Sequence, residues 1–122
     1  MTVSARSTLL AGAALVMSAA GGAPAGAGSY DGLWHVVIIT EAGSCDAAYS
    51  YPFRIAGGRI TSAGSFDISG RVSGGGGVLV RISAGSAVAS GTGRLGGGAG
   101  LGRWSAKLSG GNCSGRWQAT RS

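Results

Sequence analysis

Cys45 and Cys113 are the only cysteines in the 122-residue chain, and they stand at opposite ends of a glycine-rich segment. An even number of cysteines in a short chain with an export leader indicates a disulfide framework. Two cysteines allow only one pairing within the chain. We therefore expect one disulfide, Cys45–Cys113, that ties together the two ends of the segment.

Residues 1–27 have the features of a secretory signal peptide. Arg6 precedes a short apolar run, Leu9–Ala20, and small-x-small cleavage sequences follow around Ala25. The run is shorter than the roughly 20 residues of a membrane-spanning helix. An uncleaved anchor and a buried helix are the alternatives. We expect a periplasmic or secreted protein, not transmembrane when mature, with a single domain at residues 28–122.

Eight segments of this domain alternate in hydrophobicity with a period of two, which is typical of β-strands with one buried face. Glycine-rich turns separate them at the spacing expected for sandwiches and barrels. No segment shows a convincing helical pattern. The predicted strands are Trp34–Thr40, Tyr49–Ala56, Arg59–Ser62, Phe66–Ser73, Val78–Ser83, Ala87–Leu95, Leu101–Leu108 and Cys113–Thr120.

Three local features refine this prediction. Trp34–Thr40 is apolar on both faces, so we expect it to be the most buried strand. Pro52 cannot donate a hydrogen bond to a neighbouring strand, which places its strand at an edge or beside a bulge. Gly57 and Gly58 predict a tight hairpin turn of the kind that needs positive φ angles.

The strand count and the cysteine pair together indicate the fold. In a closed meander with an even number of strands, the first and last strands pair antiparallel. Cys45 lies just beyond the first strand and Cys113 begins the last, so closure brings them together. Seven strands would separate them. The predicted fold class is all-β, a small up-and-down antiparallel β-barrel or barrel-like sandwich of about eight strands with one disulfide.

Every tryptophan follows a glycine by two residues, in Gly32–Trp34, Gly102–Trp104 and Gly115–Trp117. Glycine permits a bend in a barrel strand, and an indole two residues later lies on the same face and can fill the space that the glycine leaves. The three indoles either pack the barrel floor or stack on a ligand. For the second case, the candidate ligand-binding residues are Trp34, Trp104, Trp117 and Tyr51.

Gly32 and Trp34, in the first strand of a small exported barrel, give the chain a resemblance to the calycin group of lipocalins, avidins and bacterial metalloprotease inhibitors. There an early Gly-x-Trp closes one end of the barrel. None of that group's ligand-contact positions can be matched in this sequence. No residue of this chain is therefore assigned to biotin binding or to protease inhibition. A calycin-type inhibitor stays among the alternatives.

The chain is also similar, over most of the mature domain, to small glycine-rich secreted proteins of soil and root-associated α-proteobacteria. That resemblance implies export and brings no known activity with it. The shared elements are Tyr30–Trp34, Ser44–Cys45, Tyr49–Pro52 and Cys113–Trp117.

Charge narrows the classes of partner. The chain has 10 Lys and Arg against 4 Asp and Glu, which gives a formal net charge of +6. A basic domain attracts nucleic acid, lipopolysaccharide, anionic lipid or acidic polysaccharide, and export disfavours nucleic acid. Cations on the polar strand faces either keep the strands soluble or contact an anionic surface. The candidates for that contact are Arg54, Arg71, Arg81, Arg103, Lys107 and Arg116.

Catalysis and cofactors find little support. The mature domain has one histidine, His35, within an apolar strand, and too few ligands for a structural zinc site. A Gly-x-Gly-x-x-Gly sequence at 91–96 lacks the surrounding βαβ pattern of a dinucleotide site. We expect no catalytic residues, no metal and no cofactor. Clustering of His35 with carboxylates in one cleft would instead indicate an enzyme. The carboxylates available for such a site are Asp31, Glu41, Asp46 and Asp67.

The sequence thus predicts an exported, non-enzymatic binding protein for a small ligand or an anionic cell-envelope component. The alternative is a secreted protein–protein interaction module, or a calycin-type protease inhibitor. In either of these, a loop such as Glu41–Ala48 or Gly96–Gly102 would dock into a protein partner.

Overall fold

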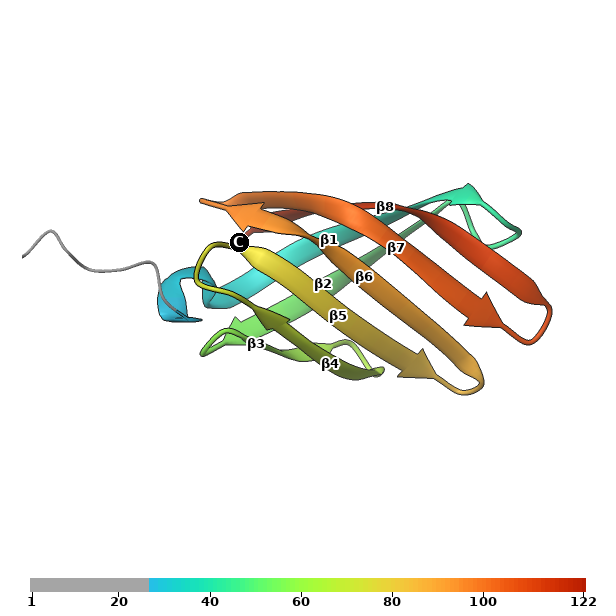
Figure 1. The fold of residues 1–122 in the computed structure, drawn as a ribbon, viewed down its shortest axis with the longest axis horizontal. Coiled ribbons are helices and arrows are strands. Elements are labelled where there is room, and N and C mark those ends of the chain that lie inside the picture. Colours follow the sequence, from blue (N-terminus) through green and yellow to red (C-terminus); the bar gives the residue numbers. More distant parts are fainter. Residues whose placement is uncertain (1–26) are drawn as a thin grey trace, which may run out of the picture.

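The computed structural model describes residues 27–122 as a closed barrel of eight antiparallel strands in meander order (Figure 1). The predicted all-β barrel is confirmed. The predicted signal peptide, residues 1–27, lies outside the described residues except for Ala27. The elements are a short 3-10 helix, η2 (Ala27–Tyr30), β1 (Gly32–Ala42), β2 (Ala48–Ala56), β3 (Arg59–Ala63), β4 (Asp67–Val72), β5 (Gly77–Ala84), β6 (Ala87–Gly96), β7 (Ala99–Leu108) and β8 (Gly111–Arg121).

All eight predicted strands are present, with ends that differ by a few residues. The predicted hairpin turn between β2 and β3 is confirmed, since Gly57 and Gly58 have φ angles of 60° and 78°. The prediction that the first strand is the most buried one is wrong, because four residues of β8 are buried and only two of β1. Trp34 and Val36 are buried, whereas His35 is exposed. In a single-layered barrel only the inward face of a strand reaches the core, whatever the hydrophobicity of its outer face.

Pairing of β1 with β8 closes the barrel, and the disulfide lies at one end of this pairing. The β1–β8 register runs from Trp34 opposite Arg121 to Ala42 opposite Ser114. Cys45, in the loop after β1, bonds to Cys113 on β8, with Cα atoms 6.1 Å apart. The predicted connection between the first and last strands is confirmed.

Pro52 lies at a local edge of the barrel wall, as predicted. β3 pairs with β2 only from Phe53 to Ala56, with a bulge in the register, so Pro52 has a strand neighbour on the β1 side alone. β3 and β4 in turn pair at only two positions. The wall is therefore weakly hydrogen-bonded between β2 and β4. Phe66, in the turn between β3 and β4, contacts Tyr51 there, edge to face, with ring centroids 5.2 Å apart.

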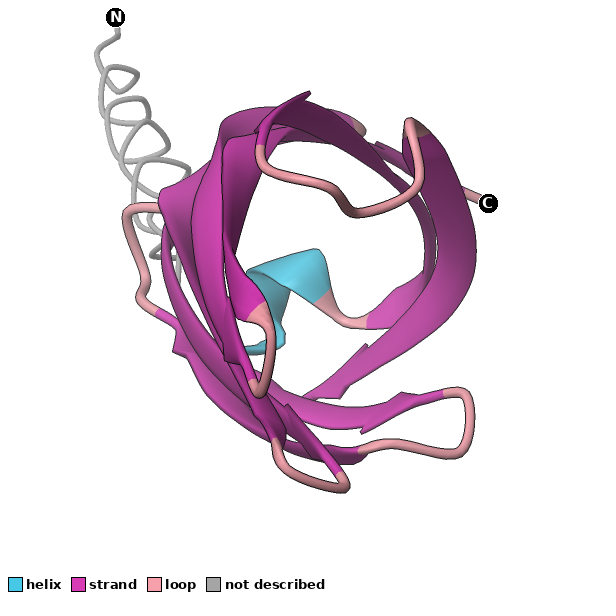
Figure 2. Cartoon of the chain, turned by 90° about the vertical axis from the view of Figure 1, so that its right-hand side faces the viewer, coloured by secondary structure: helices cyan, strands magenta, loops and turns pink. Residues whose placement is uncertain are grey.

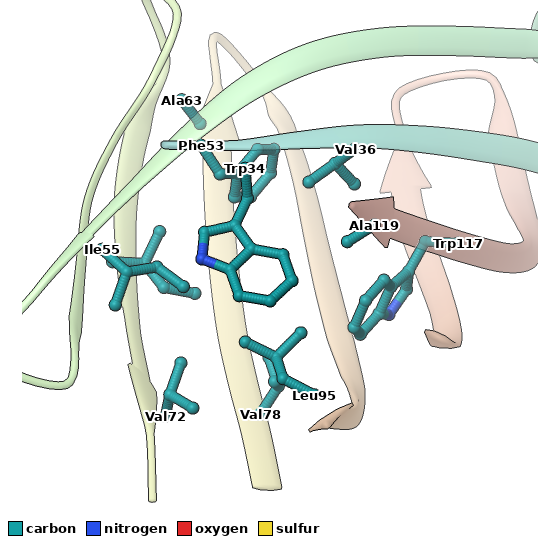
Figure 3. Close-up of a cluster of buried hydrophobic side chains, with 11 residues drawn as sticks. Trp34, Val36, Phe53, Ile55, Ala63, Val72, Val78, Leu95, Trp117 and Ala119 are labelled. Atoms are coloured by element: carbon teal, nitrogen blue, oxygen red, sulfur yellow. The ribbon is translucent and has the colours of Figure 1, made fainter. Parts of the chain in front are cut away.

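One end of the barrel is closed by η2, which Figure 2 shows at the far end of a view along the barrel. Trp34 is 1 % exposed and lies at the centre of this end (Figure 3). Its indole N–H donates to the Tyr30 carbonyl over 2.9 Å. The Arg121 guanidinium lies 4.9 Å from the Trp34 ring and donates to the carbonyls of Ser29 and Gly97. A cation–π contact and these hydrogen bonds therefore hold the helix against the floor of the barrel.

The buried core is concentrated toward this closed end. Toward the other end, Ala84 on β5, Ala87 and Ala89 on β6 and Ala106 on β7 line the interior, so small side chains leave part of the barrel unfilled there. The buried cluster consists of Trp34, Val36, Phe53, Ile55, Ile60, Ala63, Val72, Val78, Leu95, Trp117 and Ala119.

The two Gly-x-Trp sequences of β7 and β8 are paired with each other. The register sets Gly102 opposite Trp117, and Trp104 opposite Gly115. A Cβ atom at Gly102 would overlap the Trp117 indole. The expectation that each indole fills the space beside the glycine of its own strand is wrong for this pair, because the indole lies across the glycine of the neighbouring strand.

Hydrogen bonds anchor both indoles two strands away from their own. The Trp117 N–H donates to the Thr92 carbonyl on β6, and the Trp104 N–H donates to the Ile39 carbonyl on β1, each over 3.1 Å. Glycine backbone on the strand between them allows this reach. The two indoles thus connect β6, β7, β8 and β1, which includes the pairing that closes the barrel.

We predict that Gly115→Ala destabilises the protein strongly. Its Cβ would overlap the Ile39 carbonyl oxygen, and backbone atoms cannot move aside as a flexible side chain can. The expected loss is about 2 kcal/mol or more of unfolding free energy, measured by urea denaturation. Gly98→Ala is the matched control, since no atom lies within 4 Å of its Cβ, and should change stability by less than about 0.5 kcal/mol. Equal stability of the two variants would contradict this packing.

Candidate binding cavity

The barrel contains a cavity of about 270 Å³ that reaches the end opposite η2. Trp34 lies at its base, and the exposed residues Ala84 and Leu108 line its rim. Its surface is almost entirely apolar. We call the part above Trp34 the cup. The side chains that define the cup are Ile38, Tyr49, Tyr51, Phe66, Ile82, Ala89, Trp104 and Ala106.

The cup exists because its two walls differ in side-chain size. Tyr49 and Tyr51 on β2, with Phe66 in the turn between β3 and β4, form an aromatic wall. Ala89 on β6 and Ala106 on β7 face each other in the register and leave space. A small apolar cavity of this kind, with few polar groups, is typical of ligand sites in barrels.

All four side chains predicted to bind a ligand line the cavity, at different depths. Trp34 is the floor, with 1 % of its surface exposed, and Trp117 is 7 % exposed within the wall. Trp104 and Tyr51 are only half-buried. Trp34 and Trp117 are therefore packed into the core, whereas Trp104 and Tyr51 are accessible from the cup.

Two tyrosine hydroxyls are the main polar groups of the aromatic wall. The rings of Tyr49 and Tyr51 are stacked, with centroids 6.2 Å apart. The Tyr49 hydroxyl accepts a hydrogen bond from the Asp46 backbone N–H over 3.1 Å. Loss of hydration raises the pKa of the Tyr51 hydroxyl, and Tyr49 and Asp46 raise it further. Tyr51 therefore stays protonated and able to donate across the physiological pH range.

The six cations predicted to contact an anionic surface are all exposed on the outside of the barrel. They lie on β2, β4, β5, β7 and β8, and so they surround the barrel rather than share one face. The register does align several of them at one level. Successive pairing from β3 to β8 joins Arg59, Arg71, Leu79, Thr92, Arg103 and Arg116, which we call the arginine row.

Glu41 neutralises one end of the arginine row. Arg103 and Arg116 face each other on neighbouring strands, and like charges in that position repel. One oxygen of the Glu41 carboxylate accepts from Arg103 over 2.7 Å and the other from Arg116 over 2.8 Å. The hydrogen bonds from Arg116 and then Arg103 hold the pKa of Glu41 below its ordinary value.

The groups that could have formed a catalytic site are dispersed. The Asp31 carboxylate accepts a bond from the Gly58 backbone N–H at the closed end, over 3.4 Å, while Glu41 binds two arginines outside the barrel. Asp46 lies in the loop beside Tyr49, and His35 is exposed on the outer face of β1. Within residues 27–122 no three His, Cys, Asp or Glu side chains come close enough to hold a metal ion.

Sequence reasoning missed several residues that shape the cup and the arginine row. Tyr49 and Phe66 share the alternating inward phase of Tyr51 and Ile68, which is a signal that could have placed them in the cup. Arg59 joins the row only through the two-residue pairing of β3 with β4, and no local pattern indicates that register. The glycines at 91 and 93, part of the discounted dinucleotide-like sequence, lie beside Val80 and the Trp117 indole.

The chain matches no protein-family model, and no curated protein or solved structure shows significant similarity to it. The resemblances inferred from sequence motifs therefore stay expectations. In the described part of the chain, no helix is both long enough and apolar enough to cross a membrane.

We predict that Glu41→Gln destabilises the barrel at neutral pH and low salt, because Arg103 and Arg116 then repel without a shared partner. The folded-state pKa of Glu41 lies below its ordinary value of 4.5, so its contribution is present above that pH and is lost as pH falls through the folded value. The difference in urea midpoint between variant and wild type should therefore vanish in acid and shrink in high salt.

Asp67→Asn is the matched control for this effect, because Asp67 is exposed and forms no ion pair within the described residues. It should leave the urea midpoint nearly unchanged. If the two variants lose stability equally at neutral pH, the bridging role of Glu41 is wrong.

Proposed function

We propose that the protein is an exported, non-enzymatic binding protein that holds a small, largely apolar ligand in the cup. The observation that carries this proposal is the apolar cavity of about 270 Å³, which reaches the rim of the barrel. A well-formed apolar cavity with a few polar groups is where proteins most often bind small ligands.

The volume of the cavity limits the size of the ligand. One water occupies about 30 Å³ of liquid, so 270 Å³ holds roughly nine groups of that size. The ligand, or the part of it that is buried, should therefore have about nine non-hydrogen atoms. Transfer of that apolar surface out of water supplies the driving force for binding.

The side of the cup formed by β6, β7, β8 and β1 is well supported, which favours affinity. The disulfide connects the loop after β1 to β8, the Trp104 hydrogen bond connects β7 to β1 across the β1–β8 pairing, and the Trp117 hydrogen bond connects β8 to β6. Because this part of the site is already formed, ligand binding does not cost the free energy of ordering it.

An anionic cell-envelope component, the other ligand class suggested by the charge, would meet the arginine row instead. That row extends over six strands around the barrel, so a flat anionic surface would reach only part of it. Arg103 and Arg116 are already paired with Glu41. The cup brings its candidate residues to one place, and for that reason we put the small ligand first.

We predict that isopropylbenzene, an apolar probe of matching size, binds the wild-type protein saturably and shifts the backbone amide NMR signals of the cup. Ala106→Phe places a large side chain in the cup and should weaken binding by roughly tenfold or more through steric exclusion. Ser105→Phe is the matched control, because Ser105 is exposed on the outer face of the same strand. It should bind the probe as the wild type does.

Two results would contradict the proposed function. One is the absence of saturable binding by the folded wild-type protein. The other is equal weakening by Ala106→Phe and Ser105→Phe, because it would move the binding site away from the interior of the barrel.

A further inference from the structure

The polar groups of the cup differ in how far their hydrogen-bonding capacity is used. The N–H groups of Trp104 and Trp117 already donate hydrogen bonds to backbone carbonyls. The Tyr49 hydroxyl already accepts a hydrogen bond from the loop above it. The Tyr51 hydroxyl is different, because it has no hydrogen-bond partner among residues 27–122.

Tyr51 also occupies a defined depth in the cup. It faces Val36 across the β1–β2 pairing, one inward position above the Trp34–Phe53 pair at the floor and one below the Ile38–Tyr49 pair near the rim. Its ring is fixed on two sides, by stacking on Tyr49 and by the edge-to-face contact with Phe66. The phenol is therefore a positioned group rather than a freely rotating one.

Ionic groups are absent from the lining of the cavity. No Lys, Arg or His side chain, and no Asp or Glu, belongs to the lining in the described part of the chain. A carboxylate buried in the cup would have no cation to pair with, and a buried ammonium would have no anion. Burial of an unpaired charge is far more costly than burial of a neutral polar group that finds one hydrogen bond.

Resting on the proposed function, we propose that the cup selects a neutral, largely apolar molecule with one hydrogen-bond acceptor, such as a ketone, aldehyde or ester, and that the Tyr51 hydroxyl donates to that acceptor. Trp104 and the alanines of β6 and β7 contact the apolar body of the ligand. A molecule without the acceptor still enters the cup but leaves the phenol unsatisfied, and an anion of the same shape is excluded.

Three probes with the same number of non-hydrogen atoms separate the effect of the hydrogen bond from the effect of charge. Acetophenone has a carbonyl acceptor. Isopropylbenzene has a methyl group in place of the carbonyl oxygen, and benzoate has a carboxylate anion in place of the acetyl group. Dissociation constants are measured by NMR titration at neutral pH. One neutral hydrogen bond corresponds to roughly 3- to 10-fold in affinity. We expect acetophenone to bind tighter than isopropylbenzene by that factor, and benzoate to bind weakest.

Tyr51→Phe removes only the hydroxyl and keeps both ring contacts. We expect this variant to bind acetophenone and isopropylbenzene equally, with isopropylbenzene affinity within about twofold of wild type. Tyr30→Phe is the matched control, because Tyr30 belongs to η2 at the closed end and does not line the cavity. It should keep the wild-type preference for acetophenone. Thermal unfolding of each variant checks that the fold is retained.

The outcomes distinguish this inference from the proposed function. If isopropylbenzene and acetophenone bind the wild type equally, or if Tyr51→Phe keeps the preference, the cup is a ligand site but the role of Tyr51 is wrong. If benzoate binds tightest, the selection for neutral ligands is wrong. If none of the three probes binds saturably, both the inference and the proposed function fail.

Discussion

The contact between indoles and glycine backbone in β6, β7 and β8 is the interaction on which the rest of this structure depends. Each indole of the β7–β8 pair lies across a glycine of the neighbouring strand and hydrogen-bonds a carbonyl beyond it, so that Trp104 reaches β1 and Trp117 reaches β6. An indole N–H buried without a partner would be costly, and glycine is the residue that lets the ring lie close enough to find one. The same contacts support the β1–β8 pairing that closes the barrel.

This arrangement explains why the barrel is hollow at one end. Glycine and alanine on the inward faces of β6 and β7 make room for two indoles, and they leave space where no indole lies. The core is therefore concentrated around Trp34 at the η2 end. A domain of this size has a marginal core, and an unfilled cavity reduces its stability further. The disulfide offsets part of this cost, by about 4 kcal/mol for a long loop in the chain-entropy model.

Much of the fold could be predicted from the sequence because its signals are local. Alternation of side chains identified all eight strands, and the positions of Cys45 and Cys113 indicated an even strand number with closure. The outward phase of the arginines was also readable from alternation. The expectation for β1 was wrong because hydrophobicity on both faces of a strand suggests two covering layers, whereas a barrel has only one interior.

The site itself depends on register, which local patterns do not specify. Which glycine each indole covers, which arginines share a level, and which side chains face Tyr51 all follow from pairings between distant residues. A shift of one residue in any pairing would reverse those faces. The three tryptophans predicted as ligand-binding candidates all line the cavity, but their division into buried and accessible residues required the three-dimensional structure.

Fluorine NMR of protein labelled with fluorotryptophan tests the central claim most directly, because the chain has 3 tryptophans at three depths of one cavity. Single Trp→Phe variants assign the signals. When isopropylbenzene is added, the Trp104 signal should shift saturably, while the Trp34 signal, from the buried floor, should stay nearly unchanged. A saturable shift of Trp34 without one of Trp104, or no shift of any signal, would contradict a hollow cup above a packed floor.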